Sequence, residues 1–233
     1  MQEVVVRELW TYPIKGCQGV AHQEIEVTRL GVRGDRRFTM WKGGALVDQK
    51  ETPRAASIGA RVDAEAGTLI LSHAEAGELV HRIRTDGDRL PGRWVLDEFE
   101  TVDQGDEVAG WLSSALGDEV RLVATDEPWR INFPIPQMKL LHDEPKRSFT
   151  AASPVSLANV ASLDALNARL EAPVPMERFR MNVVVEGLEA HREDTLESLE
   201  NDAVRLLHVT PAERCVIVST DQHTGVRDAS DRC

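Results

Sequence analysis

Short apolar segments, each closed off by glycine or proline, divide the first third of the chain. Within them polar and apolar residues alternate, which is the pattern of a strand with one buried face. Because no helical segments separate them, as they would in a parallel sheet, the spacing favours a barrel or a sandwich. The predicted strands cover residues 4–14, 22–30, 36–41, 45–49, 68–72 and 78–84.

A first helix is predicted after residue 105, where the pattern changes. Val108, Trp111, Leu112 and Ala115 recur at helical spacing, and Gly117 is placed to end the helix.

A second helix is predicted over 153–170, with Ser153 or Ser156 as its cap. Its apolar stripe would consist of Leu157, Val160, Leu163, Leu166 and Leu170.

Four more strands are predicted in the remainder of the chain, so the sequence indicates a mainly β (α+β) fold with a few helices. The proline-rich segment 126–147 interrupts this pattern and is predicted to be a surface loop or a lid. The four strands cover residues 119–125, 181–187, 203–210 and 215–220.

The composition excludes several classes of protein. With 27 Lys+Arg against 39 Asp+Glu in 233 residues, the formal net charge is −12. This acidity argues against a nucleic-acid-binding protein, which needs a dense basic surface. No apolar run reaches the roughly 18 residues of a membrane span, and we expect no secretory signal. Three scattered cysteines favour a reducing, cytoplasmic setting.

Common cofactor and catalytic motifs are absent from the sequence. There is no GxGxxG or GxxxxGK[ST] loop, no HxH or HExxH pair and no GxSxG segment. Three cysteines cannot supply the four ligands of a plant-type iron–sulfur cluster. What remains is a set of basic residues in predicted loops and one unusual cysteine.

Two loops in the first third carry positive charge beside glycine. In YPIKGCQG, Gly16 would let the backbone approach a ligand and Lys15 would supply charge. In GVRGDRRF, Arg36 belongs to a group of arginines between 29 and 37 that suits a phosphate or a carboxylate. The alternatives are a solvated lysine at a strand end and a hairpin turn with charged flanks.

Two further pairs lie in the last third. Arg180 and Asn182 stand two apart before a predicted strand, so alternation would place both on one face; the alternative is that both face solvent. Cys215 follows Arg214, whose charge favours the thiolate that acts as a nucleophile or a soft-metal ligand. The alternative for Cys215 is a small apolar residue buried in a strand.

Taken in order, these segments resemble the MOSC family, named from the C-terminal domain of molybdenum-cofactor sulfurase. The resemblance covers nearly the whole chain. It implies an N-terminal β-barrel region at 1–120 and a β-barrel-like MOSC domain at 121–233, to which the first strands, about 1–35, contribute. The matching segments are YPIKGCQG, GVRGDRRF, VDQKETPR, VDQGDEVAGWLSSALGDEVRLV, SPVSLANVASLDALNARL, FRMNVVVEG and ERCVIVSTDQHTG.

Within this family the architecture is most similar to the amidoxime-reducing molybdenum enzymes. The resemblance implies a pyranopterin molybdenum cofactor (molybdenum-molybdopterin), with Cys215 as the catalytic residue and metal ligand. It implies reduction of a small N-hydroxylated substrate, with electrons from a separate ferredoxin, flavoprotein or haem protein. Since the chain is acidic overall, the arginines at 29–37 are the candidate positive patch on which this partner would dock. The candidate cofactor-binding residues are Lys15, Gly16, Arg36, Arg180, Asn182 and Arg214.

The sequence departs from the family pattern at a few positions. Gly16 replaces the usual serine, so that only backbone groups can contact a ligand at this position. Ala151, Lys50 and Leu196 replace a frequent Asp, Arg and Trp, respectively. One alternative function is a non-catalytic carrier or binding module for the molybdenum cofactor or for sulfur, in which Cys215 would carry a persulfide. Another is a pseudo-enzyme that has kept the fold alone.

Overall fold

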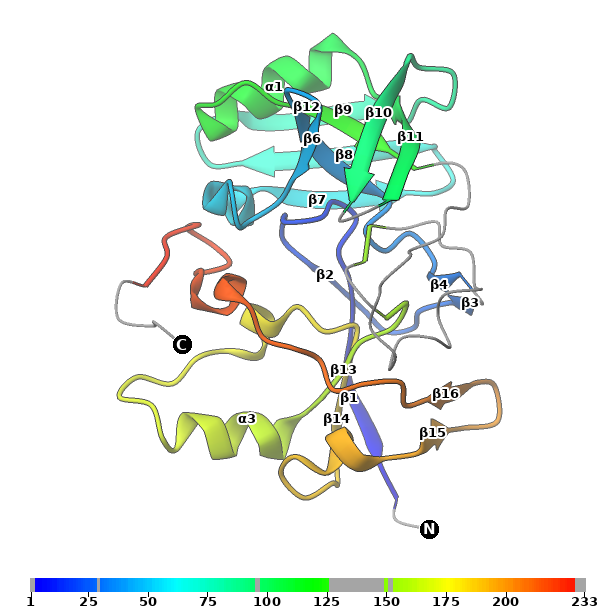
Figure 1. The fold of residues 1–233 in the computed structure, drawn as a ribbon, viewed down its shortest axis with the longest axis vertical. Helices are drawn as coiled ribbons and strands as arrows, with labels where there is room; N and C mark the ends of the chain where they lie inside the picture. Colours follow the sequence, from blue (N-terminus) through cyan, green and yellow to red (C-terminus); the bar gives the residue numbers. More distant parts are fainter. Residues whose placement is uncertain (1–2, 29, 95–96, 126–148, 151–152, 229–233) are drawn as a thin grey trace.

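The structure, a computed structural model, describes residues 3–28, 30–94, 97–125, 149–150 and 153–228. Strands dominate it, which confirms the predicted mainly β fold. The elements form two halves, one above the other in Figure 1. The first strand begins in the lower half and leads the chain into the upper one (Figure 1).

The upper half packs two antiparallel sheets and a helix around a common apolar core. One sheet has the strand order β10-β11-β12-β5-β6, and the other has the order β7-β8-β9. Phe38, Met40 and Leu71 are among the fully buried side chains of this core. The elements are β5 (Phe38–Lys42), β6 (Ala45–Val47), η1 (Pro53–Ser57), β7 (Gly59–Asp63), β8 (Thr68–His73), β9 (Gly77–Arg82), β10 (Arg89–Trp94), β11 (Asp97–Asp103), α1 (Asp106–Leu116) and β12 (Arg121–Ala124).

Helix α1 confirms the helix predicted after residue 105, and its apolar face is buried in the upper core. The helix ends at Gly117, whose φ of 68° lies in the left-handed region. The N–H of Gly117 donates to the carbonyl of Ser113 at 2.9 Å. Glycine adopts this backbone without a steric cost, which explains why the helix ends there.

The lower half is built on a sheet that joins the two ends of the sequence. Its order is β13-β14-β1-β2, with β13 parallel to β14 and the other pairs antiparallel. Ile14, shortly after β1, already belongs to the upper core, so the turn that follows β1 lies between the halves. The elements are β1 (Val5–Thr11), β2 (Val20–His22), β3 (Val27–Thr28), β4 (Gly31–Val32), β13 (Leu157–Asn159), α3 (Val160–Asn167), η3 (Met176–Phe179), β14 (Val183–Glu186), η4 (Arg192–Thr195), β15 (Ser198–Glu200), β16 (Arg205–Leu207) and η5 (Val216–Ser219), where η marks a 3₁₀ turn.

The helix predicted over 153–170 is wrong in its first half. Residues 157–159 form strand β13, and α3 covers 160–167. Asn159, and neither of the serines predicted as caps, accepts a hydrogen bond from the N–H of Ala161 at 3.3 Å. Pairing with β14 gives β13 its backbone partners, and this outweighs the helical spacing of the leucines. Within the described residues, no helix is long and apolar enough to cross a membrane.

The strand predicted at 215–220 is also wrong. Residues Val216–Ser219 form the 3₁₀ turn η5, which follows Cys215 and packs against η3. The N–H of Val218 donates to the carbonyl of Cys215 at 3.2 Å. β-Branched residues favour a strand where a partner strand is at hand, and here a turn is the neighbour.

The hairpin of β10 and β11 was not predicted from the sequence. Pro91 and Gly92 lie within β10 and interrupt the pattern expected of a strand. The structure accommodates them because β10 is at the edge of its sheet, where a missing N–H costs no ladder hydrogen bond.

Two glycines give opposite predictions for the same substitution. Gly117→Ala should lower the free energy of unfolding by about 1–2 kcal/mol, because alanine is strained in the left-handed region. Gly110→Ala should raise it by roughly 0.5–1 kcal/mol. Gly110 lies inside α1, and a Cβ added there meets no atom within 4 Å. Urea unfolding measures both, and effects of the same sign would contradict this account.

Candidate functional site

Three cationic side chains lie nearly buried where the two halves meet: Lys15, Arg36 and Arg180, here called the cation cluster. Lys15 follows β1, Arg36 precedes β5, and Arg180 comes directly after η3. Lys15 and Arg180 are each 9% exposed. The guanidinium carbons of Arg36 and Arg180 lie 4.4 Å and 4.3 Å from the ring centre of Tyr12. Three of the predicted site residues therefore meet around one buried region.

Arg36 connects the members of the cluster. Its Nη1 donates to the carboxylate of Asp35, and its Nη2 donates to the backbone carbonyl of Arg180 at 2.7 Å. Asp35 also accepts a hydrogen bond from the backbone N–H of Tyr12 at 2.8 Å and is 2% exposed. This carboxylate compensates part of the buried charge and ties the Arg36 turn to the end of β1.

Arg180 has hydrogen-bonding capacity that the described residues do not use. Its Nη1 donates to Oε1 of Gln222 at 2.8 Å, whereas its buried Nη2 has no partner among them. Burial lowers the pKa of Arg180 to about 10, and the charge of Arg36 acts in the same direction. An uncompensated buried donor is costly, so an anion placed beside Nη2 would be stabilised.

Lys15 is held in the same low-dielectric region. Its Nζ donates to the carbonyl of Phe149 at 3.2 Å and lies 3.6 Å from Oδ2 of Asp48. Burial lowers the pKa of Lys15 to about 7, and the charge of Arg36 adds to this, while Asp48 opposes it. An anion bound nearby would raise that pKa again and favour the charged lysine.

Gly16 brings the backbone close to a second loop. Its φ is 90°, and a Cβ added there would lie 3.1 Å from the backbone nitrogen of Gln49. The carbonyl of Gly16 accepts a hydrogen bond from Nε2 of Gln49 at 2.7 Å. Glycine at this position therefore permits a close backbone approach that a serine side chain would strain.

Asn182 lies beside the cluster, but the reason given for it in the sequence analysis is wrong. Strand β14 begins at Val183, so strand alternation does not relate Asn182 to Arg180. The amide oxygen of Asn182 accepts hydrogen bonds from the N–H and hydroxyl of Ser156 at 3.1 and 2.9 Å, and a longer one from Arg36 at 3.4 Å. The side chain therefore braces the backbone behind the cluster.

Arg214 and Cys215 lie at the edge of this site and not inside the cluster. Both are exposed, and Cys215 immediately precedes η5. The guanidinium carbon of Arg214 lies 4.9 Å from the ring centre of Phe179, the last residue of η3. Because Arg180 follows Phe179, one short turn separates the thiol-bearing segment from the buried cations.

The two cysteines that the structure describes differ in accessibility. Cys17 is fully buried, and burial raises the pKa of its thiol to about 12, so it stays a neutral apolar residue. Cys215 is an exposed free thiol. The sequence alternative of a Cys215 buried in a strand is therefore wrong.

A pair of glutamines that the sequence analysis did not identify joins the halves at this site. Oε1 of Gln222 accepts from Nε2 of Gln49 at 2.9 Å, and Nε2 of Gln222 donates to Oε1 of Gln49 at 3.3 Å. Both side chains are buried. They lie within VDQKETPR and TDQHTG, two segments that the sequence analysis matched to the family. Nothing about a glutamine in such a segment predicts that its side chain is buried at the site.

Several sequence predictions fall outside the described residues: the lid at 126–147, Ala151 and Arg29. Of the other arginines at 29–37, Arg33 is paired with Glu26 at the surface and Arg36 belongs to the cluster.

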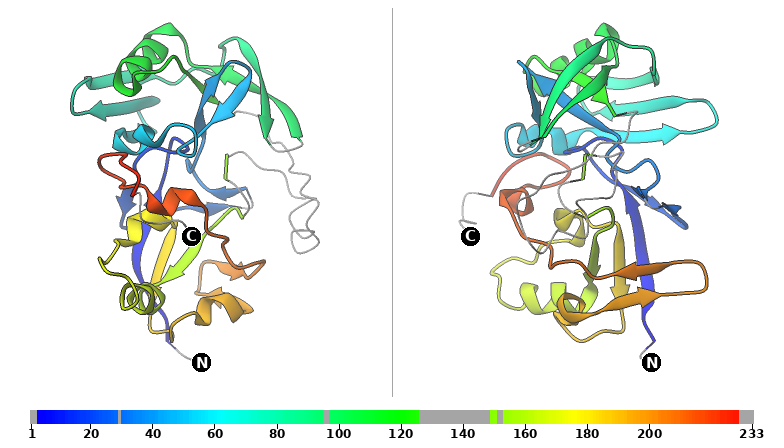
Figure 2. Two further views of the ribbon diagram at one scale, coloured as in Figure 1. Left: turned by 60° about the vertical axis from the view of Figure 1, so that its left-hand side comes forward. Right: turned by 45° about the vertical axis from the view of Figure 1, so that its right-hand side comes forward.

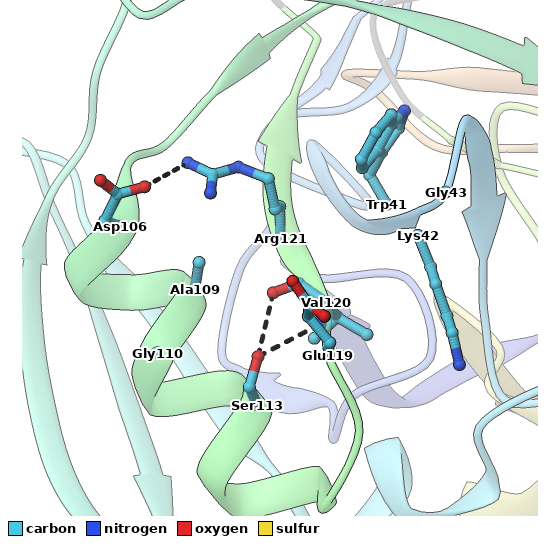
Figure 3. A pocket seen from close by; sticks show the side chains of 10 residues that line it. All are labelled: Trp41, Lys42, Gly43, Asp106, Ala109, Gly110, Ser113, Glu119, Val120 and Arg121. Carbon is cyan, nitrogen blue, oxygen red and sulfur yellow. Dashed lines mark hydrogen bonds and ion pairs between the residues drawn. The ribbon is translucent and has the colours of Figure 1, made fainter.

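A cavity of about 640 Å³ lies elsewhere, between α1, β12 and the β5–β6 hairpin (Figure 3). None of the predicted site residues lines it. Its Arg121 is already paired with Asp103 and Asp106 at 2.5 and 2.8 Å, and its Lys42 with Asp118. Because these charges are satisfied within the protein, the cavity does not compete with the cation cluster as a candidate anion site.

Lys15→Met should stabilise the cofactor-free protein at pH 7. A lysine of ordinary pKa, 10.5, stays protonated in the unfolded chain, whereas the folded pKa is about 7. Between these values the unfolded state binds more protons, so the stability of the wild-type protein rises with pH. Methionine removes this dependence, and its advantage of roughly 1–3 kcal/mol at pH 7 should shrink toward pH 10.

Urea unfolding at pH 7, 8.5 and 10 measures this difference. Lys42→Met is the matched control, because Lys42 is a half-exposed lysine paired with Asp118 and should give no comparable gain. An advantage of Lys15→Met that stays constant over this pH range would contradict the explanation from burial.

Comparison with known proteins identifies the two regions of the chain. Residues 3–119 match the MOSC N-terminal beta barrel domain, and residues 144–232 match the MOSC domain. Mitochondrial amidoxime-reducing component 1 of Homo sapiens is 32% identical, over 97% of this chain and 69% of its own. Mitochondrial amidoxime reducing component 2 of Bos taurus is 31% identical, over 99% and 71%. The chain therefore belongs to the MOSC family.

Proposed function

We propose that this protein is a molybdenum-cofactor-dependent oxidoreductase that reduces N-hydroxylated compounds. The proposal is supported by its similarity to proteins named amidoxime-reducing components over nearly the whole chain. The observation that carries it is the buried Arg180 Nη2, which lacks a partner among the described residues; the contacting turns η3 and η5 link its cation cluster to the segment of the exposed Cys215 thiol. A single ligand that carries both an anionic group and a soft metal would bind Arg180 through its anion and Cys215 through its metal.

The cluster fits the phosphate of a pyranopterin. Lys15, Arg36 and Arg180 present ammonium and guanidinium donors in a region from which water is largely excluded, where charge-assisted hydrogen bonds to a phosphate are strong. Gly16 would contribute backbone groups, and Asn182 would keep Arg36 in place. Arg214 would add positive charge at the rim, beside the thiol.

Cys215 fits the metal end of the same ligand. A thiolate is a soft ligand, and Cys215 is an exposed free thiol that a metal could reach. When bound, the molybdenum cofactor supplies the electron and oxygen transfer that reduction of an N-hydroxyl group requires. The protein's part is to anchor the phosphate, to supply the thiolate and to leave the substrate access to the exposed edge at Cys215.

We further propose that the domain boundary lies near residue 120, with 1–120 as the barrel region and 121–233 as the MOSC domain. Residues of β1 and β2 share a sheet with β13 and β14, in line with a contribution of the first strands to the second region. The relatives are named mitochondrial, and a cytoplasmic location of this chain stays a prediction.

Cys215→Ala should abolish turnover while the protein keeps its pterin, because the phosphate anchor is unchanged. Arg180→Met should instead lose pterin on dialysis. Its affinity for the cofactor should fall roughly tenfold or more, since a hydrogen bond to a charged group is lost. Turnover with a reduced viologen and an N-hydroxylated substrate, together with molybdenum and pterin content after dialysis, measures both effects.

Cys17→Ala is the control for thiol loss and should leave the metal content unchanged, because Cys17 is fully buried. Wild-type turnover in Cys215→Ala would show the ligand assignment to be wrong. A wild-type protein that binds cofactor, hands it to an apo-enzyme and never turns over would favour the carrier function. One that binds neither molybdenum nor pterin would favour the pseudo-enzyme.

We propose that electrons come from a separate ferredoxin, flavoprotein or haem protein. The chain has three cysteines, too few for a plant-type cluster, and no nicotinamide or flavin fingerprint. Turnover with NADH should therefore require an added reductase system. Because the chain carries a net charge of −12, association with the donor should depend on charge, and donor-dependent turnover should fall as the salt concentration rises.

The assay compares NADH with and without the reductase system at 20 and 300 mM salt. Steady turnover with NADH and no added protein or dye would rule out the separate donor.

A further inference from the structure

The last two residues of the turn η3 and the residue that follows it carry three consecutive side chains with three different partners. Arg180 belongs to the cation cluster, Phe179 lies beneath the guanidinium of Arg214, and Arg178 reaches η5. Both views in Figure 2 show η3 (yellow) next to η5 (orange-red), and the two turns are in contact. The backbone of η3 therefore connects the thiol-bearing segment to the buried cations, in addition to the hydrogen bond between Arg180 and Gln222.

Arg178 is the side chain of η3 that contacts the backbone of η5 itself, whereas Glu177 and Arg180 contact His223 and Gln222, which follow η5. Its Nη1 donates to Oδ2 of Asp228 at 2.5 Å and makes a longer hydrogen bond to the carbonyl of Val218 at 3.5 Å. The N–H of Val218 donates in turn to the carbonyl of Cys215 at 3.2 Å. Arg178 thus binds the residue that closes the turn behind Cys215, and its side chain is 11% exposed.

Global stability does not explain an arginine at this position. Nε of Arg178 is buried without a partner among the described residues, and an unpaired buried donor is destabilising. Asp228 is 40% exposed, and an ion pair with an exposed partner contributes little to folding. What Arg178 supplies instead is a fixed position for η5.

We propose that Arg178 is a positioning residue for Cys215, holding the thiol at a set place relative to the cation cluster. The inference rests on the proposed function, in which one ligand is held at its phosphate end by the cluster and at its metal by the thiol. A ligand anchored at two points tolerates small errors in their separation poorly, because strain appears at the weaker anchor.

The first test uses the cofactor-free full chain, so it does not depend on activity. In Arg178→Met, amide hydrogen exchange in residues 216–220 should become roughly tenfold faster, because the charged donor that fastens η5 is lost. Exchange in β1 and β14 should stay as in the wild type. The thermal midpoint should change little, because methionine also removes the unpaired Nε.

The second test uses the cofactor-loaded protein and a spectroscopic readout. The thiolate-to-molybdenum absorption band should weaken or shift in Arg178→Met, while pterin content per protein stays within about twofold of the wild type because the phosphate anchor is intact. Arg178→Lys keeps a cation for Asp228 and should restore most of the band. A purely structural role would lower pterin content and band together.

Unchanged exchange in residues 216–220 together with an unchanged band in Arg178→Met would overturn the positioning role and leave the proposed function standing. If the wild-type band survives in Cys215→Ala, the ligand assignment fails instead. Should Arg178→Met not fold, Asp228→Asn weakens the same contact from its exposed side. It should give the same changes at smaller size, and wild-type behaviour in it would likewise overturn the inference.

Discussion

The three buried cations of the cation cluster, which lie where the two halves meet, determine much of the structure around them. Buried charge is costly unless it is paired and hydrogen-bonded, and several neighbours of Lys15, Arg36 and Arg180 compensate part of their charge. Asp35 and Asp48 supply carboxylates, and Tyr12 supplies an aromatic face. Since these partners come from both halves, satisfying the charges also fixes how the halves meet.

The backbone bears part of this cost. Arg36 and Arg180 have φ values of 46° and 57°, in a region that non-glycine residues visit rarely and at a cost of about 1–3 kcal/mol each. Each left-handed residue turns the chain sharply. As a result, the carbonyl of Arg180 accepts a hydrogen bond from Nη2 of Arg36 at 2.7 Å. Strain of this kind persists where the surrounding contacts determine the conformation more strongly than the residue's own preference.

Elements that depend on residues close together in the sequence could be predicted. Elements that depend on contacts between segments far apart in the sequence could not. Strands β5, β6, β8, β9 and β12 and helix α1 follow from strand patterns, helical spacing and Gly117. The segment 157–159 became a strand because β14 lies beside it, and 215–220 became a turn because η3 does. Arg180 and Asn182 were chosen because strand alternation was expected to place both on one face; β14 begins only at Val183, yet both residues contact Arg36. Gln49 and Gln222 meet across the fold and bear no charge that would have marked them.

The pairing of β1 with β14 has a consequence for how the chain is made. Val5 and Glu186 are partners, as are Leu9 and Val183, so β1 cannot pair with β14 until all the residues between the two strands have been synthesised. The upper half consists of contiguous sequence and can fold while synthesis continues. Closing so long a loop is slow, and it leaves the edge of β1 open to other strands meanwhile. The candidate site, which needs β1, η3 and η5 together, can therefore take shape only after η5 has been synthesised.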